Sequence, residues 1–263
     1  MKRIATIAVG LLAAHTASAG VYAELFDHNL TTNTSKLKQK MYVQGGNGRI
    51  VDADGRATII KGGTLYIVDD SDKTYVVFDK ATMEQLARNL NEGMAQMKEQ
   101  LAKLPPEQRA QVEQQMGPAA AAILHGGEQQ WIVDVKDTGK SDKVDGRACK
   151  LWDVTRNGEL DEQICVVPYS AMPGTEDLQK VFATFARSFE EMAKSVPMLA
   201  GMMAGEFSAQ VKANGVPVRR RVYENGKLGE EETLVKTWRE EAVPASMFEI
   251  PAGYKVKPMG PGR

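Results

Sequence analysis

Apolar and polar residues alternate with a period of two through the first third of the chain. This alternation is typical of half-buried strands, and the glycine- and aspartate-rich breaks between the segments are typical of tight turns. Strands this close together form an antiparallel meander, because parallel strands need longer crossovers. The expected strands cover residues 21–26, 36–44, 49–53, 56–61, 65–68 and 75–78.

Two later segments follow the three- and four-residue spacing of amphipathic helices. The first is expected to begin at Thr82 as its N-cap and to stop before Pro105, after which helix resumes over 107–116 and an apolar run covers 119–124. The second is expected to start at Thr175 and to end or kink near Ser195. The first stripe is Met83, Leu86, Leu90, Met94, Met97, Leu101 and Leu104, and the second is Leu178, Phe182, Phe185, Phe189, Met192, Val196, Leu199 and Met203.

Strand patterns return between and after these helices. Residues 131–135 and 146–167 alternate again, and Asn157-Gly158 inside the second range is a strong hairpin signal. A second Asn-Gly pair, at 225–226, joins the expected strands 216–224 and 227–238, and strand-like pieces at 244–250 and 253–255 follow. The order predicts an α+β fold, in which a single curved antiparallel sheet forms an unclosed β-barrel with two helical insertions over its concave face.

The first residues have the pattern of a secretory signal peptide. Met1-Lys2-Arg3 precedes an apolar run over 4–14 and the small residues Ala17-Ser18-Ala19. A membrane anchor is the weaker interpretation, since a spanning helix needs about 20 apolar residues. We expect cleavage after Ala19, a periplasmic protein that does not span the membrane, one domain over 20–256 and a flexible tail over 257–263.

Export makes the cysteine pair interpretable. Cys149 and Cys165 are the two cysteines of the chain, and paired cysteines are usually oxidised in exported proteins. A redox-active pair would need Cys-x-x-Cys spacing near a helix start. We therefore predict a structural disulfide that joins the two strands of the 146–167 hairpin.

Charge and histidine content exclude several classes of function. The chain has 33 basic and 34 acidic residues, and cleavage would remove Lys2 and Arg3, whereas nucleic-acid binding needs a basic surplus. Outside the leader only His28 and His125 remain, so neither a zinc set nor a catalytic triad can be assembled. We predict no cofactor, no metal and no catalytic residue. Arg219, Arg220 and Arg221 are interpreted as a solvated sheet face, with a patch for anionic head groups as the alternative.

Several short segments of the chain follow one another in a recognisable order. They are 65–69 with 73–75, Gly146 with the two cysteines, 215–219, 223–226, 238–240 and 248–254. Together they resemble a family of exported bacterial proteins of unknown function, which is similar in turn to the lipoprotein-localisation carriers of the Gram-negative periplasm. The resemblance implies an unclosed antiparallel barrel with helices across an apolar cavity, and it transfers no catalytic residue.

Methionine-rich helices suit variable apolar surfaces such as a lid over a lipid-like ligand, although packing against the sheet is the favoured explanation of these methionines. The leading hypothesis is a non-enzymatic binding protein for a lipid, a lipoprotein acyl chain or an apolar segment of an envelope protein. The alternative is a structural or envelope-stress interaction protein, because LPPEQRAQVEQQM at 104–116 resembles segments of periplasmic stress chaperones; a hydrolase ranks third. The expected cavity residues are Leu86, Leu90, Met94, Met97, Phe182, Phe185, Phe189 and Met192.

Overall fold

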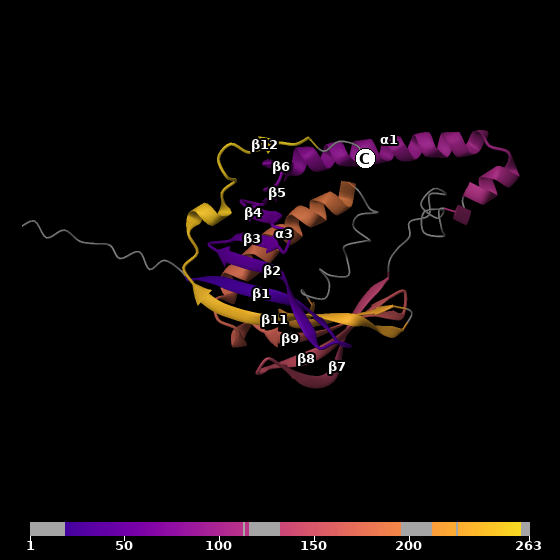
Figure 1. Ribbon diagram of the computed structural model, residues 1–263. Helices are drawn as coiled ribbons and strands as arrows, with labels where there is room; N and C mark the ends of the chain where they lie inside the picture. The colour runs from indigo at the N-terminus through magenta and orange to yellow at the C-terminus, as the bar shows by residue number, and fades with distance from the viewer. Residues whose placement is uncertain (1–18, 113, 116–131, 196–211, 225, 259–263) are drawn as a thin grey trace, which may run out of the picture.

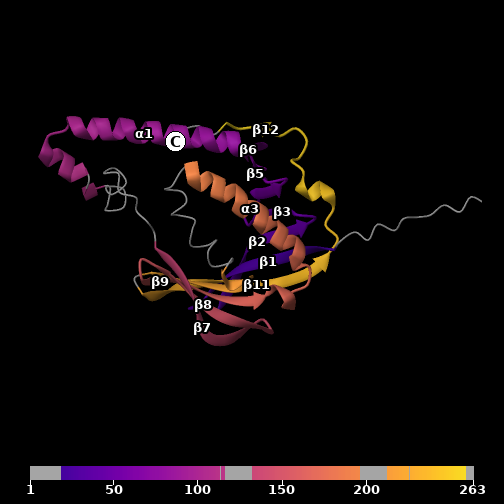
Figure 2. The same ribbon diagram turned by 180° about the vertical axis from the view of Figure 1, so that it is seen from behind.

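The computed structural model describes residues 19–112, 114–115, 132–195, 212–224 and 226–258. Within these residues, all strands belong to one 12-stranded sheet with the order β12-β6-β5-β4-β3-β2-β1-β11-β10-β9-β8-β7. The sheet twists strongly from end to end and does not close, as Figures 1 and 2 show from opposite sides. The predicted single unclosed sheet is confirmed.

The N-terminal half of the sheet is the expected meander. Its strands pair in sequence order, and each begins within two residues of its predicted start, although β1 continues further than expected into its hairpin with β2. The strands are β1 (Gly20–Asn29), β2 (Thr34–Gln44), β3 (Asn47–Asp52), β4 (Ala57–Lys61), β5 (Thr64–Asp69) and β6 (Thr74–Phe78).

The C-terminal half contains the two Asn-Gly hairpins. Asn157 and Gly158 both have positive φ angles, of 53° and 86°, as a two-residue type I′ turn requires. β11 pairs with both β10 and β1, so it joins the two halves of the sheet. The strands are β7 (Val133–Val144), β8 (Arg147–Arg156), β9 (Glu159–Pro168), β10 (Gly215–Glu224) and β11 (Lys227–Glu241).

Besides β7, which continues to Val144 although the expected strand ended at residue 135, two features of this half differ from the prediction. Residues 245–248 form a 3-10 helix, η2 (Ala245–Phe248), instead of strand, because the Met247 N–H bonds back to the Pro244 carbonyl at 2.9 Å. The last strand, β12 (Lys255–Val256), pairs parallel to β6, so the sheet is not antiparallel throughout. The chain reaches that edge by crossing the face of β3–β5, where Phe248 is buried with Ile59 and Val68.

The helices begin and end at local signals. The expected N-cap at Thr82 is wrong, because the Asp79 carboxylate accepts the Thr82 N–H at 2.8 Å and α1 (Lys80–Lys103) starts right after it. These contacts hold the pKa of Asp79 below its usual range. The stop before Pro105 is confirmed, and helix resumes over 106–112. α3 (Thr175–Ser195) follows the short η1 (Tyr169–Ala171) and begins at Thr175, the expected cap; the expected end or kink near Ser195 lies where the described residues stop.

The two helices relate differently to the sheet. α3 lies across one face and contacts β1, β2 and β3, whereas α1 runs outward from β6 and makes its main contacts with β6 and α3 (Figure 1). The expectation that both helices cover the concave face therefore holds for α3 alone. The reason lies in the topology, since β6 and β7 are at opposite ends of the strand order and the insertion between them must lead the chain across the whole sheet. No described helix is both long and apolar enough to cross a bilayer.

Candidate apolar site beside helix α3

The start of α3 is fixed to the sheet by a buried acid. The Asp177 carboxylate is 3% exposed, accepts the Gly45 N–H at 2.6 Å and accepts from the Lys180 ammonium at 2.8 Å. The carboxylate raises the pKa of Lys180 above its ordinary value. Because Gly45 lies in the β2–β3 turn, this contact ties the first turn of the helix to the middle of the sheet.

The next turn of α3 packs directly on the strands. Leu178 and Val181 are buried with Val21 and Val43 in the main core cluster. Gly48 on β3 makes the close approach possible, since a Cβ there would lie 3.3 Å from a methyl carbon of Val181. The first half of α3 is therefore ordinary core packing.

Strand register shows which residues share this face with α3. Gly48 lies opposite Ile60, Ile60 opposite Leu65, and Leu65 opposite Phe78, and directly opposed residues point to the same side of a sheet. A second row on the same face, two residues further along each strand, runs through Ile50, Thr58, Ile67 and Val76. We call six of these residues the apolar shelf: Ile50, Ile60, Leu65, Ile67, Val76 and Phe78.

Burial decreases from α3 across the shelf. Ile60 packs against the core cluster beneath α3, but all six shelf residues are only partly buried or exposed, and Ile67 is 38% exposed. Along α3 the same gradient appears, from buried Leu178 and Val181 to half-buried Phe182 and Phe185. An apolar surface therefore continues from the core toward the β5–β6 edge without being fully covered.

The predicted cavity residues are only partly located. Phe182 packs against the core under α3, and Phe185 is half-buried on the same helix. Met94 is half-buried and Met97 is 39% exposed, both on α1. The side chains of Leu86, Leu90, Phe189 and Met192 lie outside the described residues. The sequence interpretation missed the shelf on β3–β6, although the alternation in those strands already contained it.

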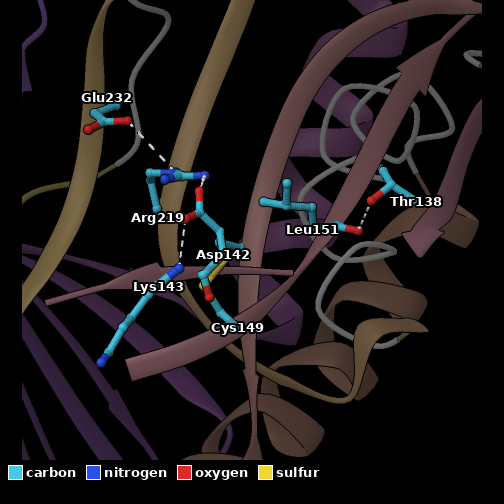
Figure 3. Close-up of a disulfide and its surroundings, with 8 residues drawn as sticks. Thr138, Asp142, Lys143, Cys149, Leu151, Arg219 and Glu232 are labelled. Carbon is cyan, nitrogen blue, oxygen red and sulfur yellow. Dashed lines mark hydrogen bonds and ion pairs between the residues drawn. A yellow bond between two sulfur atoms is a disulfide. The ribbon is translucent and has the colours of Figure 1, made fainter. Parts of the chain in front are cut away.

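The disulfide lies on the other half of the sheet. Cys149 and Cys165 are bonded with their Cα atoms 5.4 Å apart, as predicted, and both are buried. Beside them Arg219 pairs with Asp142 at 2.9 Å and lies 3.8 Å from Glu232 (Figure 3). Glu232 also binds Arg221 at 2.7 Å. Arg219 is 8% exposed, so its predicted solvated position is wrong; the two carboxylates compensate the buried charge.

Polar clusters elsewhere have ordinary structural roles. The Ser35 hydroxyl lies 2.9 Å from His28 Nδ1 and 2.7 Å from Lys236 Nζ, all on the outer part of the β1–β2–β11 surface. The described contacts of this surface include no set of donors that could stabilise an oxyanion, and Lys236 also lies over the Phe26 ring. Within the described residues no group of three or more His, Cys, Asp or Glu could hold a metal ion.

A polar cavity of about 620 Å³ lies at the start of α3, before the half-buried Phe182 and Phe185. It is lined by parts of η1, the first turn of α3, Glu240 of β11 and Ala19. Its acidic and hydroxyl lining makes it unsuitable for an apolar ligand.

The comparison with known families follows this geometry. The sequence profile described as a domain of unknown function, DUF4412, matches residues 93–254. The match covers more than half of the chain, so the protein belongs to the DUF4412 family, which confirms the predicted membership of a family of unknown function. No curated protein matches the sequence.

Solved structures with related shapes have very different sequences. An uncharacterised conserved protein from Thermus thermophilus has 8% identity and a TM-score of 0.44 over 91% of this chain and 90% of its own. MucB in the Pseudomonas aeruginosa MucA/MucB complex has 11% identity and a TM-score of 0.34, over 90% of this chain and 56% of that one. A second MucB structure has 12% identity and a TM-score of 0.28, over 90% of this chain and 58% of that one. This chain thus spans little more than half of MucB, and because every TM-score is below 0.5 we transfer nothing from these structures.

Proposed function

We propose that the protein is a non-enzymatic periplasmic binding protein that holds a lipid acyl chain between α3 and the apolar shelf. The observation that carries the proposal is the continuous row of incompletely buried apolar residues that extends from the core beneath α3 to Ile67. Binding sites for apolar ligands are concave and mostly apolar, and large uncovered apolar patches on soluble proteins usually mark interaction sites.

The energetics favour a ligand on the shelf. Each Å² of apolar surface removed from water contributes about 25 cal/mol, so an acyl chain that covers the shelf gains from every shelf residue it contacts. A row across four neighbouring strands is roughly 14 Å long at about 4.8 Å per strand spacing. That elongated shape suits a linear chain better than a compact ring.

A second candidate function is interaction with an envelope protein through α1. The helix projects from the β6 edge (Figure 2), and Met97 on it is 39% exposed. An amphipathic helix that leaves the sheet offers an apolar stripe to a partner groove. This is the chaperone-like or stress-related alternative, in which the shelf completes a core and needs no ligand.

The test compares two exposed apolar residues. Ile67→Gln places a polar group on the shelf, whereas Leu228→Gln makes the same kind of change on β11 at a similar exposure, 41% against 38%. We expect Ile67→Gln to weaken binding of a fluorescent fatty acid about tenfold and Leu228→Gln to leave it unchanged. Native mass spectrometry of protein from the periplasm should also show a bound lipid.

Two results would count against the acyl-chain site. One is a wild-type protein that neither carries a lipid nor binds the probe. The other is equal loss of probe binding in both variants, which would indicate non-specific adsorption. Either result would leave the α1 interaction as the remaining candidate.

A further inference from the structure

The first residue of β1 has no room for a side chain. A Cβ at Gly20 would lie 2.4 Å from the Val43 carbonyl oxygen and 2.9 Å from the Gln44 Cβ. Gly20 is buried and pairs with Glu241 of β11. A shift of the strand by one residue would push Ala19 or Val21 into that space, so this position in the sheet requires glycine and fixes where the chain enters it.

The peptide bond before Gly20 lies at the wall of the polar cavity. Ala19 lines the cavity of about 620 Å³ together with Glu176, Asp177 and Glu240, and its lining includes no lysine or arginine. Glu240 lies opposite Val21 on the neighbouring strand. Asp177 is already engaged by Gly45 and Lys180, whereas Glu240 makes no ion pair within the part of the chain that the structure describes.

We propose that this cavity is the binding site of the processed N-terminus, in which the α-ammonium of Gly20 pairs with Glu240. Cleavage of the Ala19–Gly20 bond by the export machinery consumes one water molecule, which gives its hydroxyl to the Ala19 carboxyl group and a proton to the new Gly20 amine. The amine then ionises where a neutral peptide N–H stood before, and the cavity gains the cation that its lining lacks.

The titratable groups around the amine come from three elements. β11 contributes Glu240 and Glu241, and Glu241 is itself paired with Arg239 at 2.7 Å. α3 contributes Glu176 and the Asp177–Lys180 pair, and η1 contributes the Tyr169 side chain. The unpaired charges that remain are acidic, and nearby opposite charges favour the protonated form of an amine.

The proposal does not depend on the acyl-chain site. It assigns a role to Gly20 and to the acidic cavity, neither of which contacts the shelf. The ammonium would link the start of β1 with β11 and the first turn of α3. Cleavage of the leader would therefore add a contact that holds the start of α3 against the sheet. The precursor would lack that link.

The test measures the titration of the N-terminal amine. Protein purified from the periplasm is labelled with limiting isotopic acetic anhydride between about pH 6 and pH 10, and the N-terminal peptide is quantified by mass spectrometry. We expect a chain that begins at Gly20 and an α-amino pKa above the ordinary range of about 7.7–8.0. Glu240→Gln should move this pKa back toward the ordinary range, and Glu176→Gln should move it less.

The matched control is Glu231→Gln, an exposed glutamate on the same strand that pairs with Asn29, far from the cavity. It should leave the titration unchanged. An ordinary α-amino pKa in the wild type would overturn the proposal, as would equal effects of Glu240→Gln and Glu231→Gln or a chain that keeps residues 1–19. The wild-type measurement decides the matter even if Glu240→Gln fails to fold.

Discussion

At the scale of single residues, Arg219 is the side chain whose burial was not predicted from the sequence. Its neighbours along the chain are arginines, which indicated a solvated strand. Of its partners, Asp142 comes from β7, a strand distant in sequence, and Glu232 comes from β11, the other strand of the same hairpin. Alternation correctly placed Arg219 and Arg221 on one face, since both reach Glu232. Burial could not be predicted, because it depends on which strands become neighbours.

The two-arginine arrangement makes Glu232 the sensitive member of the cluster. Glu232→Gln keeps the shape but leaves two guanidinium groups with one carboxylate, Asp142, and breaking a buried pair costs about 3–5 kcal/mol. We expect a loss near the lower end of that range, because Arg221 is partly exposed. Urea unfolding measures it, and Glu230→Gln on the exposed part of β11 is the control; a loss no larger than the control's would contradict the role of the cluster.

Asp142 gives this cluster a pH dependence. The Lys143 N–H and then Arg219 hold the pKa of Asp142 below its ordinary value. A lowered folded-state pKa contributes stability that is present above the unfolded value of about 3.9 and is lost as pH falls through the folded value. Urea midpoints of wild type and Asp142→Asn should therefore differ at about pH 6 and converge toward about pH 2. A difference that stays constant with pH would contradict this assignment.

At the scale of elements, α3 changes character along its length. Leu178 is 3% exposed in the core, whereas Phe185, two turns later, is half-buried. Leu178→Ala should cost about 2–5 kcal/mol. Phe185→Ala removes a larger side chain but should cost less than the roughly 3–5 kcal/mol typical of a buried phenylalanine, and it should weaken fatty-acid binding. Thermal melting beside probe titration tests both; a full core cost at Phe185 without any binding defect would favour the structural alternative.

The elements that the sequence predicted are those with local signals. The Asn-Gly turns, the period-two strands β1–β6 and the Pro-Pro helix stop all depend on neighbouring residues. β7 was predicted as a short strand, because residues 136–143 are polar. In the structure these residues lie at the edge of the sheet, and the register is irregular between Asp137 and Ser141. Charged, irregular edge strands resist pairing with other chains. Of the candidate site, Phe182 and Phe185 on α3 were predicted and the apolar shelf was not. No local sequence signal indicates which part of a sheet face a helix will leave uncovered.

At the scale of the whole molecule, the C-terminal segment holds the N-terminal half of the sheet. After β11 the chain crosses β3–β5, where Phe248 is 4% exposed, and Tyr254 donates to Asp70 at 2.9 Å before β12 joins β6. Phe248→Ala should cost about 3–5 kcal/mol and should raise amide hydrogen exchange in β4 and β5 more than in β8 and β9. Uniform acceleration across the sheet would show instead that the two halves unfold as one unit.

The pairing of β1 with β11 has a consequence for how the chain is made. Gly20 and Glu241 are register partners, yet almost the entire chain separates them. As the chain is synthesised, the N-terminal meander emerges first and can pair within itself, but the outer side of β1 must wait until β11 has emerged. Contacts of such long sequence separation form slowly. The pairing in the middle of the finished sheet is therefore among the last to form, and until then the outer side of β1 is an unpaired strand edge.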